Sequence, residues 1–431
     1  MPAHHVRSSP LLAPLFDAEA RRLAMIFVVV YFAQGMWSLP EQSITFVLKE
    51  RFDYTATNVA TLFSITSVAW LLKPAYGLLS DALPLFGRRR KSYFLLSTAF
   101  AAAAGFALSA LPVVTPRRIA ALFALMGLGF AITDVLVDAL MVEHGKRPGL
   151  TGGFQAVQWA AIYGASVIVG VAGGALTERG LLHLAFGLAA VFPLVSFVLG
   201  LCVIREPRIE RRAGQLATTW VAIRGSLGSR DLWVVAGFIS LWGFSPSIGT
   251  PLFYYQTDTL KFSQQFIGVL SSLTAAGAIA GALAYGGLSR RWPLRHLFNA
   301  AIGLGVAATL AYLAYTDRTS AITIDVANGV VSTIAMLAFL DLAARACPRQ
   351  AEGTFFALLM SVYNAGLQGS EIVGSRLYDV LGYTALIWIS AGTTALCWIL
   401  VPWVPVERVQ EGAGEPRPES GGLDATRRTV S

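Results

Sequence analysis

The stretch KPAYGLLSDALPLFGRRRKSY, residues 73–93, connects two long apolar runs. It contains glycines, Asp81 and the basic cluster Arg88, Arg89, Arg90 and Lys91. Four consecutive cations cannot cross a bilayer, so this loop is expected in the cytoplasm. The glycines let helices approach closely, and Asp81 can pair with an arginine in one conformation and release it in another. We therefore predict that Asp81 and the basic cluster form a gate between two membrane spans.

The composition of the whole chain is typical of a membrane protein. Hydrophobic residues make up 55% of its 431 residues and charged residues 13%, whereas soluble globular chains carry about 25% charged residues. The net charge of +8 does not indicate nucleic-acid binding, because the basic residues lie in the gaps between apolar runs. Cys202, Cys347 and Cys397 lie in or beside apolar segments, far apart and without CxxC spacing, which predicts buried free thiols rather than a disulfide or a metal site.

We predict an all-α polytopic protein with twelve membrane spans, each of about 20 residues. The first six spans are expected at 24–47, 57–80, 92–112, 119–142, 154–176 and 182–203. The second six are expected at 232–256, 265–288, 296–315, 320–341, 353–376 and 383–404. They divide into helical bundles at 24–204 and 231–405, with a polar linker at 205–230. Residues 1–23 are expected to be a polar N-terminal segment without a cleavable signal peptide, and 406–431 a disordered tail.

The distribution of Lys and Arg predicts the orientation. The loops on the side of the two termini hold 24 of the 33 basic residues, the alternate loops hold 8, and Lys73 alone lies inside a span. Since basic residues concentrate on the cytoplasmic side, both termini are expected in the cytoplasm.

The two halves resemble each other. GLLSD at 77–81 recurs as GGLSR at 286–290, an offset of 209, and Asp138-Ala139-Leu140 recurs at 341–343, an offset of 203. Two parallel six-helix repeats are typical of carriers that hold substrate near the middle of the membrane. The pattern therefore favours a transporter over a channel or a scaffold.

Ionisable residues inside the spans are costly and indicate function. Asp134 and Asp138 are four residues apart and share one helix face, where two neighbouring carboxylates resist double ionisation. We therefore expect them to take part in proton coupling. An alternative for Asp138 is that it only braces the basic loop. Lys73 lies at a depth from which it can pair with either aspartate or bind an anionic substrate, and the sequence leaves both open.

Polar and aromatic residues on the fifth span predict a binding face. Gln155, Gln158, Trp159 and Tyr163 follow helical spacing, and amides beside aromatic rings suit a flat heteroaromatic ligand. The same residues can instead hold this helix against a neighbour.

Two spans are expected to be broken at matching positions. The seventh contains Pro246 and Pro251 within WGFSPSIGTP, residues 242–251, and the first contains QGMWSLP, residues 34–40. Broken helices at matched positions indicate the gate and the binding site, so Gln34 is predicted to bind substrate and both prolines to serve gating. Glu41 and Glu371 either cap an outer gate or reach interfacial water.

Several stretches resemble the folate–biopterin transporter family of the major facilitator superfamily. They are YFAQG at 31–35, LKE at 48–50, WLLKPAYGLLSD at 70–81, LFGRRRKSY at 85–93 and DVLVDALMVE at 134–143. The resemblance implies the major facilitator fold, with two pseudo-symmetric six-helix bundles, and proton-coupled uptake of folates or pterins by alternating access.

We expect a monomer in the lipid bilayer of a bacterial inner or plasma membrane, with protons and a folate- or pterin-class solute as its partners and no cofactor. The competing interpretation among transporters is a permease for muropeptides, peptides or drugs. A membrane-embedded enzyme or receptor is disfavoured, since the sequence has no paired His with carboxylate, GxSxG, metal-ligand spacing or phosphate loop.

Overall fold

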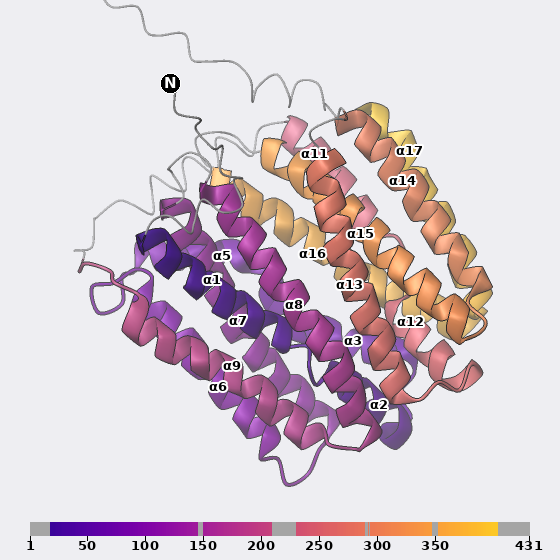
Figure 1. Ribbon diagram of the computed structural model, residues 1–431, viewed down its shortest axis with the longest axis horizontal. Helices are drawn as coiled ribbons and strands as arrows, with labels where there is room; N and C mark the ends of the chain where they lie inside the picture. Colours follow the sequence, from indigo (N-terminus) through magenta and orange to yellow (C-terminus); the bar gives the residue numbers. More distant parts are fainter. Residues whose placement is uncertain are drawn as a thin grey trace, which may run out of the picture.

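The computed structural model describes residues 18–144, 150–208, 230–288, 292, 294–346 and 352–403, and these ranges are almost entirely helical. They form two bundles that lie side by side (Figure 1). The first bundle comprises α1 (Ala18–Met36), α2 (Glu41–Phe52), α3 (Ala56–Thr66), α4 (Val68–Leu71), α5 (Lys73–Ala82), α6 (Lys91–Ser109), α7 (Pro116–His144), α8 (Leu150–Glu178) and α9 (Leu182–Val203). The second comprises α11 (Arg230–Gly243), α12 (Gly249–Tyr254), the π-helix η2 (Tyr255–Thr259), α13 (Gln264–Leu288), α14 (Leu294–Ala311), η3 (Tyr312–Ala314), α15 (Arg318–Ala346), α16 (Glu352–Leu381), α17 (Tyr383–Leu400) and η4 (Val401–Trp403).

Nine helical segments within the described ranges are long and apolar enough to cross a membrane. They coincide with nine of the predicted spans. The other three predicted spans coincide with α3–α5, with α11–α12 and with α16. The first two of these spans are interrupted, and α16 carries several polar residues. The total of twelve spans stays a prediction, as do the division into domains and the linker, most of which lies outside the described residues.

Each half is built around its own apolar core. In the first half, Phe123 and Phe186 are fully buried, and α6 packs between α7 and α9. In the second half, Phe238 and Phe298 are fully buried, α14 packs against α15 and α17, and α13 packs against α15. Leucines, valines and phenylalanines on the outer faces of α6 and α9 stay exposed, as expected for helices that face lipid.

The two halves meet along α8 with α13 and along α3 with α16. Glycines allow the first contact, because a Cβ atom at Gly174 would lie 2.9 Å from the Cα atom of Gly268. The hydroxyl of Ser272 also donates a 2.6 Å hydrogen bond to the carbonyl of Val167. Small residues thus bring the helix backbones of the two halves into direct contact.

The expected helix breaks are present. Residues 37–40 separate α1 from α2, and residues 244–248 separate α11 from α12. Ser38 and Ser247 hold corresponding places in these breaks, 209 residues apart, which is the offset of the predicted repeat. The second predicted span is broken as well, at Ser67 and Leu72, and Pro74 lies in the first turn of α5, where a missing backbone N–H is tolerated.

Several helix boundaries differ from the prediction. The first predicted span, 24–47, is too short at both ends, because α1 begins at Ala18 and α2 continues to Phe52. These additional turns are more polar than the bilayer centre, so hydropathy alone does not detect them. Cys202 and Cys397 are free thiols, as predicted. Cys397 is buried as expected, but the expected burial of Cys202 is wrong, because it lies on the exposed outer face of α9; Cys347 lies outside the described residues.

Candidate functional site

A buried ion pair lies between two helices of the first half. The Nζ atom of Lys73, the first residue of α5, lies 2.5 Å from Oδ2 of Asp134 on α7. Asp134 is only 2% exposed. Of the two roles that the sequence left open for Lys73, the structure shows the pairing with this helix; binding of substrate stays a prediction.

The second carboxylate of the pair binds a different helix. The hydroxyl of Tyr31 on α1 donates a 2.5 Å hydrogen bond to Oδ1 of Asp138. The Lys73 ammonium group also attracts the Asp138 carboxylate electrostatically. This contact connects Asp138 to α1 rather than to the basic loop, so the alternative that it only braces the loop is not supported by the described contacts. Tyr31 was not predicted as a site residue, although it opens the YFAQG stretch.

The charges of this cluster do not balance. Two carboxylates face one ammonium group, so full ionisation leaves one uncompensated negative charge in a largely buried place. Such a charge is costly in a medium of low dielectric constant. The cluster can relieve it by taking up one proton on a carboxylate, which is the chemistry that proton coupling needs.

The predicted binding face on α8 is only partly described. The amide of Gln158 is buried and its Nε2 atom has no hydrogen-bond partner among the described residues. The rings of Trp159 and Tyr163 lie 5.6 Å apart at an angle of 32°. The Tyr163 hydroxyl interacts with Thr333 on α15, so this face points toward the other half. The side chain of Gln155 lies outside the described residues.

Gln34 joins this region from α1. Its neighbour Gly35 packs against Ile162 and Ala165 of α8, which brings the two helices together. The Oε1 atom of Gln34 is buried and, in the part of the chain that the structure describes, accepts no hydrogen bond. Buried polar atoms without a partner are rare and need an explanation, and a bound ligand is one.

An aromatic stack next to the break in the first span was not predicted. The Trp37 ring lies 4.7 Å from the Trp70 ring and 5.0 Å from the Phe123 ring, in both cases at an angle of 19°. Trp37 also has a buried Nε1 atom without a partner among the described residues. Tryptophans within two interrupted helical segments were the sequence signal that could have indicated this stack.

The predicted gate is anchored within the first half. The Glu206 carboxylate accepts hydrogen bonds of 2.8–3.2 Å from the backbone N–H groups of Arg89, Arg90 and Lys91. The Arg90 guanidinium donates a 2.6 Å hydrogen bond to Ser80. The Asp81 side chain lies outside the described residues, so its pairing stays a prediction. Glu206 was missed, since its helix-capping role depends on how α9 ends.

Contacts between the halves gather at the end of the bundles that contains residues 53–55, which we call the far end. The N–H and hydroxyl of Thr57 both donate to Asp379, at 3.0 and 2.5 Å. Lys49 pairs with Asp258 at 2.7 Å, and the Tyr254 hydroxyl donates to a backbone carbonyl of the first half. These contacts close the far end.

The two glutamates singled out from the sequence lie at the helix breaks. Glu371 accepts hydrogen bonds from the hydroxyls of Ser247 and Thr250, which ties α16 to the break between α11 and α12. Glu41 interacts with Ser38 in the matching break and also faces Glu371. The hydrogen bonds of Glu371 lie within the second half, so the choice between an outer gate and contact with interfacial water stays open for both glutamates. The roles of Pro246 and Pro251 in gating stay predictions.

Comparison with known proteins places these features in a family. The BT1 family matches residues 34–412 of the chain. The folate-biopterin transporter of Synechocystis sp. is 31% identical over 376 residues, which cover 82% of this chain and 74% of the relative. Folate transporter 1 of Plasmodium falciparum is 22% identical over 386 residues, which cover 85% of this chain and 74% of that one.

Solved structures share the fold at low sequence identity. The D-xylose-proton symporter superposes with a TM-score of 0.70 at 12% identity, covering 90% of this chain and 98% of that chain. The nucleoside transporter NupG superposes with a TM-score of 0.67 at 14% identity, covering 92% of this chain and 100% of that chain. The predicted major facilitator fold is thereby confirmed.

We expect the Lys73–Asp134 pair to show strong coupling in thermal stability. Lys73→Gln leaves a buried carboxylate unpaired and should destabilise the protein by about 3–5 kcal/mol, whereas Lys73→Gln with Asp134→Asn should lose much less. Melting temperatures in detergent provide the ranking. Lys49→Gln, which removes a cation from a partly exposed pair at the far end, is the control and should cost about 0–1 kcal/mol. Additive losses in the double variant would contradict this pairing.

Proposed function

Because the chain belongs to the BT1 family, we propose that it is a secondary transporter that moves folate- or pterin-type solutes across the membrane by alternating access, in symport with protons. The observation that carries the coupling is the charge imbalance of Lys73, Asp134 and Asp138 inside the first half. One proton neutralises this cluster, and a neutral cluster is the form that low-dielectric surroundings favour.

Substrate and proton binding are coupled through Lys73. A folate carries carboxylates, and an anionic group that binds Lys73 competes with Asp134 for the same ammonium. Asp134 then loses the only cation that the described structure places beside it, and its carboxylate binds a proton more readily. Substrate and proton thus favour each other's binding, as symport requires.

The polar atoms without partners support recognition of a flat heterocycle. Gln34 offers an acceptor and Gln158 offers a donor, and both are buried without a partner in the described structure. An amide-like edge of a pterin ring presents the complementary donor and acceptor. Trp159 and Tyr163 lie on the same helix as Gln158 and supply aromatic faces for stacking.

The closed far end supports assignment of the structure to a state of the transport cycle that is closed to the outside. We propose that the far end faces outward and that both termini lie in the cytoplasm, following the Lys and Arg bias of the loops. The hydrogen bonds of Asp379 and the ion pair of Asp258 then hold the outer side shut. Substrate exchange in this state takes place at the cytoplasmic side.

Uptake into proteoliposomes tests the proposed function. We expect labelled folate or a labelled pterin to accumulate when an inward proton gradient is imposed, and a muropeptide to stay outside. Asp134→Asn should abolish accumulation but retain exchange of substrate across the membrane, because only the titratable group is lost. Accumulation of the muropeptide alone would contradict the substrate class, and full gradient-driven accumulation by Asp134→Asn would remove Asp134 from the mechanism.

The far-end contacts should set the fraction of molecules in which the far end is closed. Asp258→Asn with Asp379→Asn removes two partly exposed contacts, each worth about 0–1 kcal/mol. Their loss should change the ratio of molecules closed at the far end to molecules open there several-fold. Nitroxide labels at Arg117 and Thr319, one on each half, report the distance by pulsed electron paramagnetic resonance after the native cysteines are replaced by serine. We expect a larger fraction of the double variant than of the wild type to show a long distance between the two labels. Asp53→Asn, which removes one exposed carboxylate at the same end, is the control and should leave the distances unchanged; identical distance distributions in all three proteins would refute the role of these contacts.

A further inference from the structure

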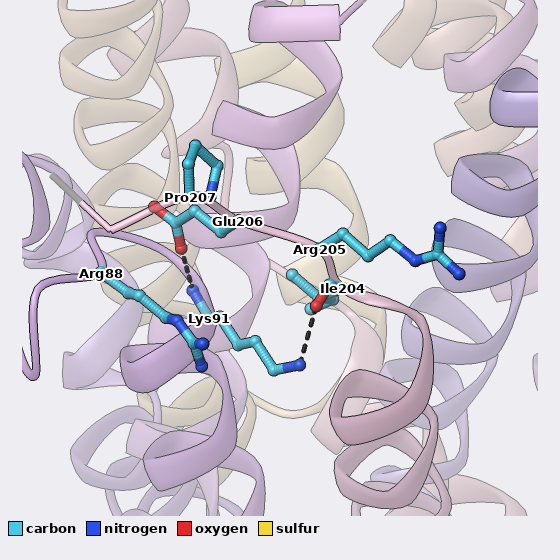
Figure 2. A pocket seen from close by; sticks show the side chains of 6 residues that line it. All are labelled: Arg88, Lys91, Ile204, Arg205, Glu206 and Pro207. Carbon is cyan, nitrogen blue, oxygen red and sulfur yellow. Dashed lines mark hydrogen bonds between the residues drawn. The ribbon is translucent and has the colours of Figure 1, made fainter.

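A pocket of about 380 Å³ lies beside the basic loop, between the start of α6 and the end of α9 (Figure 2). Its lining residues are Arg88, Lys91, Ile204, Arg205, Glu206 and Pro207. The pocket is separate from the Lys73–Asp134 cluster, and two of its residues, Arg88 and Lys91, belong to the basic cluster of the predicted gate.

The pocket has an excess of positive charge. Three of its side chains are cations and one is a carboxylate. That carboxylate, on Glu206, is already occupied by the backbone N–H groups at the start of α6. The pocket therefore contains more positive charge than its own acid can neutralise.

Its hydrogen-bond donors are also incompletely used. Lys91 donates to the carbonyls of Leu201 and Ile204, both at 2.8 Å, and an ammonium group has a third N–H. The Nε atom of Arg88 is buried and has no hydrogen-bond partner among the described residues. Arg205 is exposed, and Figure 2 shows its guanidinium extending away from Glu206. Two guanidinium groups and one ammonium N–H are thus available to an anion.

The apolar surface next to the pocket indicates where the anion comes from. α6 and α9 lie side by side at the edge of the first half, away from the second half (Figure 1). Leu96 and Phe100 on α6 and Val198 and Leu201 on α9 are large, apolar and exposed. This surface ends in the last turn of α9, directly before the residues that line the pocket. Acyl chains can therefore lie along the two helices while a headgroup occupies the pocket.

We propose that this pocket binds the phosphate of an anionic phospholipid. Arginine presents its donors in a planar fork that matches a phosphate, and basic pockets between membrane helices suit such headgroups. Arg88 and Lys91 hold the phosphate oxygens, the exposed Arg205 side chain turns back toward them when the phosphate binds, and the acyl chains follow α6 and α9. The bound lipid connects the loop before α6 to the end of α9, so the anionic lipid content of the membrane affects how firmly the predicted gate is anchored.

Lipid titration followed by native mass spectrometry tests this site. Protein purified in detergent is titrated with phosphatidylglycerol or with phosphatidylcholine, and the dissociation constant of the first bound lipid is measured. Phosphatidylglycerol should bind more tightly. Arg88→Gln with Arg205→Gln should weaken its binding roughly 30-fold, since each cation near the surface contributes roughly fivefold. Arg205→Gln alone should weaken phosphatidylglycerol binding roughly fivefold. Because this side chain is exposed, the single variant should fold normally and tests the site even if the double variant misfolds.

Two comparisons decide between this proposal and its alternatives. Arg117→Gln with Arg118→Gln removes two exposed arginines at the far end and should leave phosphatidylglycerol binding unchanged. Equal weakening in both double variants would show general charge attraction and overturn the site. Inorganic phosphate, added at constant ionic strength against chloride, should not displace the lipid. Displacement by phosphate, with no preference between the two lipids, would show a site for free phosphate and overturn the lipid assignment.

Discussion

The cost of a charge inside a membrane is the constraint on which this structure depends. Lys73 and Asp134 lie within the helical bundle, and neither is tolerable there alone. Their pairing holds α5 against α7, and Asp138, one turn further along α7, holds α1 through Tyr31. Three helices of the first half are therefore positioned by one small set of charges. Any event that changes this charge balance, such as binding of a proton or an anion, acts on all three helices.

The two halves share an architecture but differ in their polar chemistry. In the second half, the buried Asp325 accepts hydrogen bonds from the hydroxyls of Tyr312 and Tyr315, at 3.3 and 2.8 Å, and Gln256 of the π-helix donates to Tyr315. This carboxylate is surrounded by neutral donors, whereas Asp134 has a cation. π-Helices often mark functional positions, and here one carries both Gln256 and the far-end residue Asp258. In the proposed mechanism the charge chemistry of coupling belongs to the first half, and the second half contributes hydrogen-bonded packing near the closed far end.

Much of this could be predicted from the sequence, because the bilayer imposes simple rules. Apolar runs, basic loops and the 209-residue repeat indicated the fold, and the four-residue spacing of Asp134 and Asp138 placed both on one helix face. Partners from distant segments could not be predicted in the same way. Tyr31 reaches Asp138 across 107 residues, and Glu206 caps α6 only because α9 ends beside it. The far-end contacts of Asp379 join residues 322 positions apart, and no local pattern encodes that distance.

In the proposed mechanism, substrate binding and protonation of the Lys73–Asp134–Asp138 cluster are linked. The most direct measurement is the number of protons taken up when substrate is added to purified protein in weakly buffered detergent solution. Addition of folate should make the wild-type protein take up protons, and Asp134→Asn should bind folate with little or no proton uptake. Folate binding without any proton uptake by the wild type, or with the same uptake by Asp134→Asn, would contradict the account.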